Sequence, residues 1–553
     1  MSDIFELSDR AVELIADGDP IGATFMGING RDHLWTDYSP AGHQARSDMW
    51  NAIQADAMAI ETTTDIDSLA KRVLLAEAAE AIDLFEHGDH YRDLNNIVSS
   101  LQNIKDVLDV MGRGSAAEWA NIAARIETMD CAIGGYQMTL AEGLTKGFAV
   151  ARRQAEAAIV EARVMGGDES PFLGLLEEFS ESTIDDAELS ARLSAGVEVA
   201  RREYSQLGEW LQATYLPQAV EKDACGRERY ISEARKHLGM TIDIDETYAW
   251  GWAEVARLRA RMAEVCRDID STKTVEEVVE MLEADESRSA GSVEEFIETM
   301  QQVQNDAVEQ LAGVHFDVPE QILHVDVKVS PPGGALAPYY NGPSEDFSRP
   351  GSVWYPVGSK TTFPLWEEMS TAYHEGFPGH HLQVGVQTAM GDQLSRFHRV
   401  AVWSTGAGEG WALYAEHLMG ELGFHDRPEY ELGMLVAQLM RACRVVIDIG
   451  SHCELPIPDE ASFHPGEAWT WDLAAEMLIT VAFQGKDMAE SEATRYLGWP
   501  GQAISYKIGE KVILELREEL SQRDDFDLKQ FHSNVLSVGS IGLELLQELV
   551  RAA

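Results

Sequence analysis

The segment TAYHEGFPGHHLQ concentrates the side chains best suited to chemistry, namely His374, Glu375, His380 and His381. Many zinc hydrolases carry such residues on one helix. In the HExxH pattern, two histidines four residues apart bind Zn²⁺, and the intervening glutamate activates water. Here the fourth position after His374 is Pro378, which cannot bind a metal. The second ligand must therefore come from further along the chain.

The next two histidines follow His374 by six and seven residues. In an unbroken helix, position six would point about 120° away, and position seven would lie about 10 Å along the axis, too far to share one ion. Pro378 and Gly379 interrupt the helix, and a two-residue bulge there would return His380 to the place of the missing ligand. We therefore expect His374 and His380 as ligands, with His381 as a supporting neighbour or a substitute.

A third protein ligand is needed, because a catalytic zinc keeps three protein ligands and one open position. The segment GAGEGWALYAEHLMGELG has an apolar stripe at helical spacing, which puts Glu409 in the first turn of a helix that ends at Gly423. We expect Glu409 as the third ligand. Glu416, seven residues further on the same face, is an alternative ligand or a supporting partner. This set predicts one zinc ion, although Co²⁺ or Mn²⁺ could occupy it.

A line of polar residues runs along the next predicted helix, which covers residues 430–452. Arg441, Arg444, Asp448 and His452 follow one another at steps of three, four and four, so they share one face of a mostly apolar helix. Their burial is costly unless they pair or face a wet cavity. Arg444 and Asp448 are expected to form an ion pair. Alternatively, His452 or an arginine stabilises an oxyanion or binds a substrate carboxylate.

Further candidates lie in two other stretches. The long helix after GWPG carries Tyr506, whose phenol can donate to a developing oxyanion. The stretch after Val314 is rich in Pro, Gly and aromatic residues and offers Tyr339, Tyr340 and Arg349 as substrate contacts, since loops carry binding groups that helices cannot place. Core packing of the aromatic rings and surface exposure of the arginine are the alternative interpretations.

The spacing of apolar residues predicts a mainly α fold. Residues 41–312 are overwhelmingly helical in pattern. The alternation in ILHVDVKV predicts a strand, so a small sheet with long loops is expected after residue 313. We expect a helical region over 1–313 and a metal-site region over 314–553, joined in one integrated structural unit.

The 553-residue chain has a formal net charge of −51, spread along its length. Such a surface repels nucleic acid and anionic membranes, so neither is expected as a partner. The five cysteines are scattered without a CxxC motif, and the N-terminus lacks the basic start and apolar core of a signal peptide. Together these features predict a cytoplasmic protein. A homodimer is left open.

Several motifs carry a resemblance to a known family. The segments HEGFPGHHLQ, EGWALYAE, RVVIDIGSH and PGQAISYKIG, with PPGGALAPYY and SRPG ahead of them, resemble the bacterial family catalogued as domain of unknown function 885. The resemblance is specific between Val314 and Leu520. That family is similar to zinc metallocarboxypeptidases of the thermostable carboxypeptidase Taq type, a gluzincin-like group built as a helical shell around a deep groove.

The resemblance implies that the zinc ligands are His374, His380 and Glu409. It also implies that Glu375 is the general base and that Tyr506 is a helper. The first hypothesis is therefore a zinc-dependent metallopeptidase, carboxypeptidase-like, that hydrolyses short peptides. It also needs a cation for the terminal carboxylate, for which Arg349, Arg441 and Arg444 are available. One alternative is a zinc amidohydrolase acting on a small non-peptide amide. Another is a non-catalytic helical binding protein with a vestigial metal site.

Overall fold

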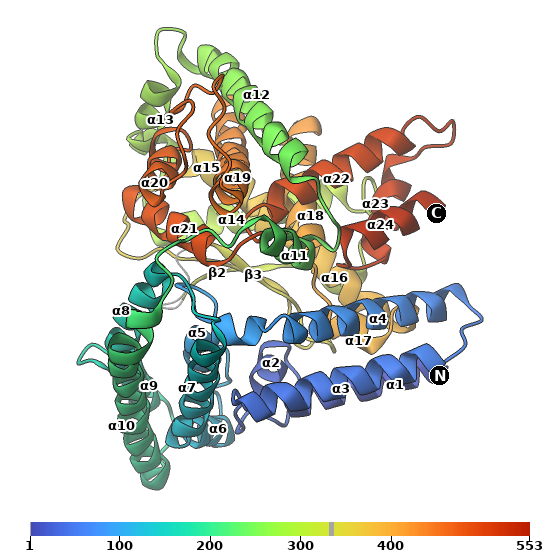
Figure 1. Ribbon diagram of the computed structural model, residues 1–553. Coiled ribbons are helices and arrows are strands. Elements are labelled where there is room, and N and C mark those ends of the chain that lie inside the picture. Colours follow the sequence, from blue (N-terminus) through green and yellow to red (C-terminus); the bar gives the residue numbers. More distant parts are fainter. Residues whose placement is uncertain (1, 331–336) are drawn as a thin grey trace. The chain divides into compact units, whose positions relative to one another are not determined.

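The computed structural model describes residues 2–330 and 337–553, so the PPGGAL part of the PPGGALAPYY motif lies outside the described residues. The mainly α fold expected from the sequence is confirmed. Contacts divide the chain into two compact units, one of Met1–Asp223 with Ser395–Ala401 and one of Ala224–Leu394 with Val402–Ala553. Figure 1 labels the elements of both units.

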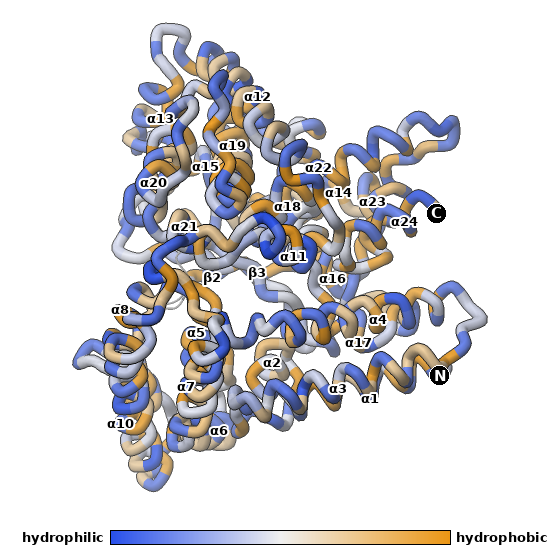
Figure 2. Tube along the Cα trace, viewed as in Figure 1, coloured by the Kyte–Doolittle hydropathy of each residue, from blue (hydrophilic) through white to orange (hydrophobic). Residues whose placement is uncertain are grey.

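The first unit is built from helices. They are α1 (Asp3–Gly18), α2 (Pro20–Phe25), α3 (Pro40–Ala59), α4 (Asp65–Glu86), α5 (Ser100–Asp106), α6 (Ala116–Glu127), α7 (Met129–Lys146), α8 (Arg152–Gly166), α9 (Phe172–Glu181), α10 (Ala187–Trp210) and α17 (Arg396–Ala401). The longest of them, α10, packs against α6, α7, α8 and α9. Its buried face carries Leu193, Val197, Tyr204 and Leu207 at helical spacing, and Figure 2 shows the matching mixture of hydrophobic and hydrophilic residues.

The second unit holds the remaining helices. They are α11 (Arg227–Leu238), α12 (Ile244–Asp270), α13 (Val275–Glu283), α14 (Val293–Leu311), α15 (Leu365–Glu375), α16 (His380–Ala389), α18 (Thr405–Glu421), α19 (Pro428–Cys453), α20 (Trp471–Thr480), α21 (Lys486–Gly498), α22 (Ser505–Leu520), α23 (Leu528–Ser537) and α24 (Leu543–Ala552). Most residues of α19 are buried, and the helix packs against α12 and α15. A mostly buried helix thus carries the line of polar residues seen in the sequence.

The small sheet expected after residue 313 is present. Strand β2 (Asp326–Val329) pairs in parallel with β4 (Ser352–Tyr355), and β3 (Tyr339–Asn341) pairs with β4 in the antiparallel sense. Two short strands, β1 (Ser289–Ala290) and β5 (Phe363–Pro364), form a separate antiparallel pair. Side chains from β2, β4, α14 and α15 share one hydrophobic core, which includes Phe296, Val327, Val353 and Met369. This core fixes α15, the helix that carries His374.

Glycines allow α18 and α22 to cross at very close range. A Cβ at Gly410 would lie 2.4 Å from the backbone carbonyl carbon of Gly509, and a Cβ at Gly509 would lie 2.0 Å from the backbone oxygen of Gly406. Because both separations are far below van der Waals contact, a larger residue would force the helices apart. The crossing therefore positions the helix that carries Glu409.

The two compact units do not follow the change in composition at residue 313. The boundary between them falls after Asp223 and the helices α11 to α14 belong to the second unit. The reason is packing, since α12 contacts α19, α14 contacts α15 and α11 contacts α18. The groove expected around the site stays a prediction.

Candidate metal centre

The metal-site segment consists of two helices separated by a tight turn. Helix α15 ends at Glu375, residues 376–379 form the turn, and α16 begins at His380. The peptide bond between Phe377 and Pro378 is cis. A complete helix break therefore replaces the two-residue bulge expected from the sequence, and it brings His380 beside His374 as that bulge would have done.

Backbone contacts hold this turn in place. The N–H of Gly379 donates to the carbonyl of Tyr373 at 3.0 Å. A Cβ at Gly379 would lie 2.0 Å from the carbonyl oxygen of His374, so the turn requires glycine there. From α14, the side chain of Gln304 accepts from the N–H of Phe377 at 2.7 Å and donates to the carbonyl of Ala372 at 2.7 Å. The buried polar groups of the turn are thus paired.

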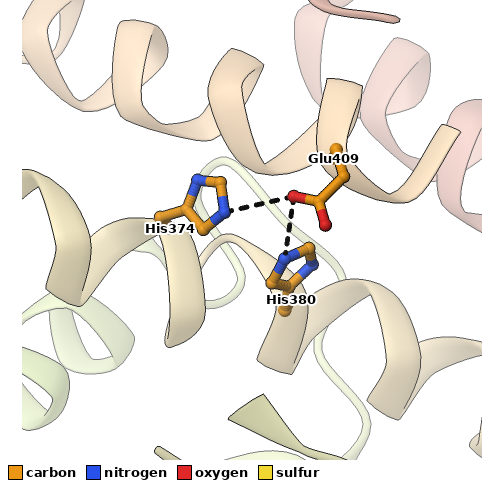
Figure 3. A group of neighbouring side chains, drawn as sticks. All are labelled: His374, His380 and Glu409. Carbon is orange, nitrogen blue, oxygen red and sulfur yellow. Dashed lines mark ion pairs between the residues drawn. The ribbon is translucent and has the colours of Figure 1, made fainter. Parts of the chain in front are cut away.

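Three side chains converge on one point. Oε2 of Glu409 lies 3.3 Å from Nε2 of His374 and 3.5 Å from Nε2 of His380 (Figure 3). The three ligand atoms lie within 4.8 Å of one another. Ligands about 2.0–2.1 Å from a tetrahedral zinc are separated by about 3.3 Å, because the edge of a tetrahedron is about 1.6 times its centre-to-corner length. The spacing around Glu409 therefore fits zinc.

The polar atoms at this point also fit a cation. Oε2 of Glu409 is buried and has no hydrogen-bond partner among the described residues. Burial alone would lower the pKa of His374, but the carboxylates of Glu409 and Glu416 outweigh it and raise that pKa to about 9. The pocket therefore favours a positive charge, which a divalent ion bound by two imidazoles and a carboxylate would supply.

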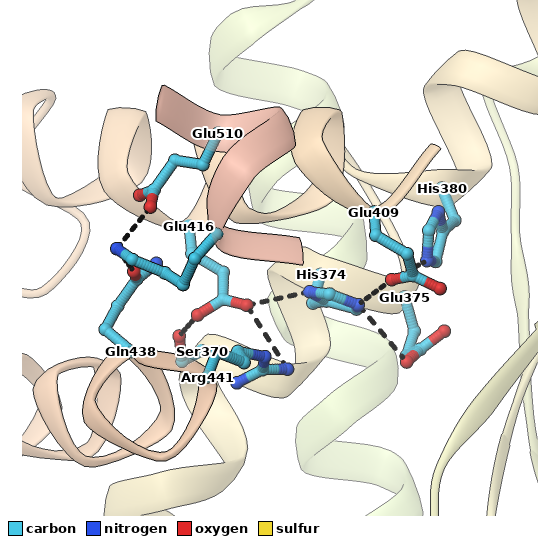
Figure 4. A network of polar contacts seen from close by, with 10 residues as sticks. Ser370, His374, Glu375, His380, Glu409, Glu416, Gln438, Arg441 and Glu510 are labelled. Carbon is cyan, nitrogen blue, oxygen red and sulfur yellow. Dashed lines mark hydrogen bonds and ion pairs between the residues drawn. The ribbon is translucent and has the colours of Figure 1, made fainter. Parts of the chain in front are cut away.

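Glu416 supports the cluster from behind and is no ligand in this arrangement. Its Oε1 lies 2.7 Å from Nδ1 of His374, and its Oε2 accepts from the hydroxyl of Ser370 at 2.6 Å. Nδ1 of His374 is thus occupied by Glu416. The guanidinium of Arg441 lies 3.6 Å from the same Oε1. Figure 4 shows these side chains together. Of the two roles expected for Glu416, the structure fits the supporting partner.

Glu375, the expected general base, lies beside the cluster. Its Oε1 lies 3.8 Å from Nε2 of His374, on the side that faces the cluster, and its side chain is 13% exposed. Burial raises the pKa of Glu375, and the nearby histidines oppose this rise. A carboxylate next to the metal position with a raised pKa is suited to accepting and returning a proton.

The structure separates the roles of the two adjacent histidines. His381 is fully buried; its Nε2–H donates to the carbonyl of Ile322 at 2.9 Å, and its Nδ1 accepts from the hydroxyl of Tyr340 at 3.0 Å. Both ring nitrogens are therefore used away from Glu409. The favoured choice of His380 as second ligand agrees with this geometry, and Tyr340 contacts the metal-site helix rather than open solvent.

Tyr506 and Arg444 lie together near the cluster. The guanidinium of Arg444 covers the ring of Tyr506 at 4.6 Å. Burial raises the pKa of Tyr506, and the negative charge of Glu409 raises it further, so the phenol keeps its proton. Arg444 is itself engaged, since Nε donates to the hydroxyl of Tyr496 at 3.0 Å and Nη2 to Glu492 at 2.8 Å. The ion pair expected between Arg444 and Asp448 is replaced by this pair with Glu492.

Two other members of the polar line have structural partners. Asp448 accepts from the hydroxyl of Tyr230 at 2.7 Å and from the N–H of Gly501 at 2.9 Å. His452 accepts at Nδ1 from the N–H of Cys225 at 3.3 Å, and its Nε2–H donates to the carbonyl of Tyr496 at 2.9 Å. With both nitrogens bonded to backbone, His452 serves the packing of α19 and not the cluster, which corrects its expected catalytic role.

The remaining predicted contacts lie on the sheet and the loop beside it. The ring of Tyr339 stacks on that of Trp354, with centroids 6.2 Å apart. Arg349 is exposed, and its N–H donates to the hydroxyl of Ser344 at 2.9 Å. A substrate contact by either residue stays a prediction.

Sequence reasoning missed two residues of the site. Ser370 lies one turn before His374 on α15, and helical periodicity could have found it. Trp403 precedes α18, is 47% exposed, and its ring lies 5.7 Å from that of His380. A Cβ at Gly408 would lie 2.3 Å from this ring, so the glycine makes room for it. No sequence pattern links Trp403 to the site, because the contact depends on the loop.

Comparison of the sequence with models of known protein families identifies the family of this chain. The family described as "Bacterial protein of unknown function (DUF885)" matches residues 20–550. The chain belongs to this family. The resemblance seen in the sequence motifs is confirmed at this level and extends over the helical N-terminal half. A search of curated proteins finds no match.

Two solved structures share the fold of this DUF885 member. One is described as the putative lipoprotein from Colwellia psychrerythraea, with a TM-score of 0.86 and 23% identity over 99% of this chain and 98% of that chain. The other, from Shewanella oneidensis, is described as a putative lipoprotein of unknown function, with a TM-score of 0.73 and 17% identity over 100% of both chains. At these identities the likeness shows the fold.

These descriptions correct one expectation. The sequence was expected to encode a cytoplasmic protein, whereas both of these structures of the same fold are described as putative lipoproteins, which contradicts that expectation. The cytoplasmic prediction relied in part on the scattered cysteines, and free thiols do not identify a compartment. Among the described helices, none combines the length and apolar character needed to cross a membrane.

Proposed function

We propose that the protein is a zinc-dependent metallopeptidase, carboxypeptidase-like, that hydrolyses short peptides. The observation that carries the proposal is the convergence of Nε2 of His374 and Nε2 of His380 on Oε2 of Glu409, at distances of 3.3 and 3.5 Å that suit a tetrahedral zinc, with Glu375 beside them. Two histidines and one carboxylate leave the fourth position open for chemistry. A site with only a structural role has no use for a base there.

Each residue of the cluster has a distinct task in this proposal. When bound, zinc would supply the Lewis acidity that activates water and polarises the carbonyl of the scissile bond. Glu375 accepts the proton of the attacking water and returns it to the leaving amine. Glu416 holds the ring of His374 through Nδ1, which keeps Nε2 directed at the cluster.

The likeness to zinc metallocarboxypeptidases of the thermostable carboxypeptidase Taq type is part of the proposal. It is supported by the His–Glu helix, by the second histidine on the following helix and by the glutamate on a third helix. Tyr506 is a helper: its protonated phenol lies close enough to Glu409 to feel its charge, so it can donate a hydrogen bond to the developing oxyanion.

The decisive test replaces Glu375 with Gln. We expect the variant to bind zinc as the wild type does and to lose hydrolysis of short peptides, because the amide cannot accept the proton. Glu367→Gln is the matched control on the same helix: burial raises the pKa of Glu367 to about 8, so the neutral amide resembles its protonated form. Zinc content is measured by elemental mass spectrometry and hydrolysis with a peptide library.

Other outcomes would redirect the proposal. Retained turnover in Glu375→Gln would rule out this mechanism. Hydrolysis of small amides but of no peptide would favour the amidohydrolase. A wild-type protein that takes up no zinc would favour the non-catalytic binding protein.

A further inference from the structure

Arg441 is a partly buried arginine, one of whose guanidinium nitrogens has no hydrogen-bond partner among the described residues. Its side chain is 13% exposed, and its Nε atom is buried without a hydrogen-bond partner among the described residues. The ion pair recorded for it joins Nη2 to Oε1 of Glu416 at 3.6 Å, beyond hydrogen-bond length. A buried guanidinium N–H without a partner is costly, because that donor has lost its hydrogen bonds to water.

Two buried arginines of the same unit, Arg444 and Arg495, have close partners. Arg444, one turn along α19, donates to Tyr496 and Glu492. Arg495 donates to both oxygens of Glu492, at 2.7 and 2.8 Å, and to Gln502 at 2.5 Å. Arg259 and Arg288 of the same unit also carry a buried nitrogen without a hydrogen-bond partner in the described part of the chain, so what distinguishes Arg441 is its place beside Glu416 and the candidate active site, where an anionic ligand could pair with it.

Glu416 does not fill this need. Its Oε1 is directed at Nδ1 of His374 at 2.7 Å, and its Oε2 accepts from Ser370 at 2.6 Å. Both oxygens thus have a shorter partner than Arg441. Figure 4 shows the guanidinium of Arg441 beside Glu416 and close to His374, and the positive charge of Arg441 acts on the pKa of both His374 and Glu375.

We propose that Arg441 binds the free C-terminal carboxylate of the peptide substrate, which would make the enzyme an exopeptidase that acts at the carboxyl end. This inference rests on the proposed function and specifies its substrate. In a peptide cleaved at its last bond, the terminal carboxylate lies one residue, about 3.5 Å, from the scissile carbonyl. Arg441 lies on the chain of contacts that begins at His374, and its planar fork matches a carboxylate.

A structural role for Arg441 gives a different expectation. If the arginine served only to balance the charge of Glu416, its loss would weaken the support of His374 and thereby zinc binding and the hydrolysis of every substrate. If it binds the substrate carboxylate, its loss affects only substrates that carry one. Peptides with a free carboxyl end and the same peptides with an amidated end separate the two roles.

The experiment compares kcat/KM for such a pair of N-blocked dipeptides in the zinc-loaded wild type, in Arg441→Met and in Arg441→Lys. We expect the wild type to prefer the free acid by about 30-fold or more. Arg441→Met should lose this preference through a fall in kcat/KM for the free acid, while its zinc content stays near that of the wild type. Arg441→Lys should keep part of the preference, since it retains the charge without the fork, and it serves if Arg441→Met does not fold. Arg267→Met, at an exposed position, is the control.

A second pair of probes keeps the inference separate from the proposed function. A phosphinic dipeptide analogue with a free carboxyl end and its amidated counterpart are titrated into the zinc-loaded proteins by calorimetry. If no peptide is hydrolysed, the proposed function fails, yet tighter binding of the acid that is lost in Arg441→Met still supports the inference. Equal treatment of acid and amide by the wild type, or an equal loss for both in Arg441→Met, overturns it.

Discussion

Oε1 of Glu416 lies 2.7 Å from Nδ1 of His374, on the opposite side of the ring from Nε2, which faces Glu409 at 3.3 Å. Since the fully buried carboxylate can only accept, Nδ1 carries a proton, and a metal bound at Nε2 would take the place of the second proton that the raised pKa of His374 favours. The contact fixes both the tautomer and the direction of the ring. It therefore determines how well His374 can bind a metal.

Replacing Glu416 with Gln tests this relationship. The amide keeps the shape but loses the charge, so we expect zinc affinity to fall about 10–100-fold. The affinity is measured by competition with a chelator at constant pH. Glu518→Gln, at an exposed position on α22, should leave the affinity unchanged. An unchanged affinity in Glu416→Gln would show that the contact does not tune the site.

The two adjacent histidines should respond differently to removal. His380→Ala deletes a ligand, so we expect the zinc content to fall from about one ion per chain to near zero. His381→Ala removes hydrogen bonds to Ile322 and Tyr340, so we expect retained zinc and a loss of stability of about 1–3 kcal/mol. Elemental analysis and urea denaturation of both variants provide the comparison. Zinc retained in His380→Ala and lost in His381→Ala would reverse the assignment.

Residue chemistry allowed much of the site to be predicted, because His374, His380 and Glu409 are ligand types at positions that local helical patterns could place. The form of the helix break was not predictable. It depends on Gln304, which lies on α14 and pairs with the turn from about 70 positions earlier in the sequence. Local spacing suggested a bulge and could not include this partner.

The polar line on α19 shows where sequence reasoning ends. Helical periodicity correctly put Arg444, Asp448 and His452 on a buried helix, since periodicity is a local property. Their partners were wrong because these come from other elements: Glu492 from α21 and Tyr230 from α11. Which buried charge meets which depends on how distant helices pack.

Arg444 and Arg495 both form ion pairs with the buried carboxylate of Glu492, and this arrangement yields a prediction about stability. Glu492→Gln would leave two buried guanidinium groups without their carboxylate, so we expect a loss of about 3–5 kcal/mol in the free energy of unfolding. Glu490→Gln, which breaks a solvent-exposed ion pair with Lys486 on the same helix, should change the free energy of unfolding by less than about 0.5 kcal/mol. Urea denaturation at pH 7 measures both.

The effect of Glu492 should also depend on pH. Burial acts to raise its pKa, but the charges of Arg444 and Arg495 outweigh burial and lower the pKa well below the ordinary value of 4.5. A carboxyl group with a lowered pKa contributes stability above its ordinary pKa, and this contribution is lost as the pH falls. The difference in unfolding free energy between wild type and Glu492→Gln should therefore narrow by about 1 kcal/mol per pH unit below pH 4.5. A difference that widens in acid would contradict the assigned direction.

The crossing of α18 and α22 connects packing to the metal centre. Glu409 directly precedes Gly410, and a Cβ at Gly410 would lie 2.4 Å from the backbone of Gly509. Gly410→Ala should therefore push the helices apart, at a cost of about 1–3 kcal/mol in unfolding free energy, and shift Glu409 away from the histidines. We expect zinc affinity to fall together with stability.

Gly420→Ala on the same helix is the matched control for this prediction. A Cβ at Gly420 would meet only side chains, 3.3 Å from Cδ2 of His425 and 3.6 Å from Sδ of Met434, which can move. Because alanine favours the helix by about 1 kcal/mol over glycine, we expect this variant to be as stable as the wild type or slightly more stable and to bind zinc normally. Stability is measured by urea denaturation and zinc affinity by chelator competition, for both variants. Normal zinc affinity in a destabilised Gly410→Ala would show that the crossing supports the fold without positioning Glu409.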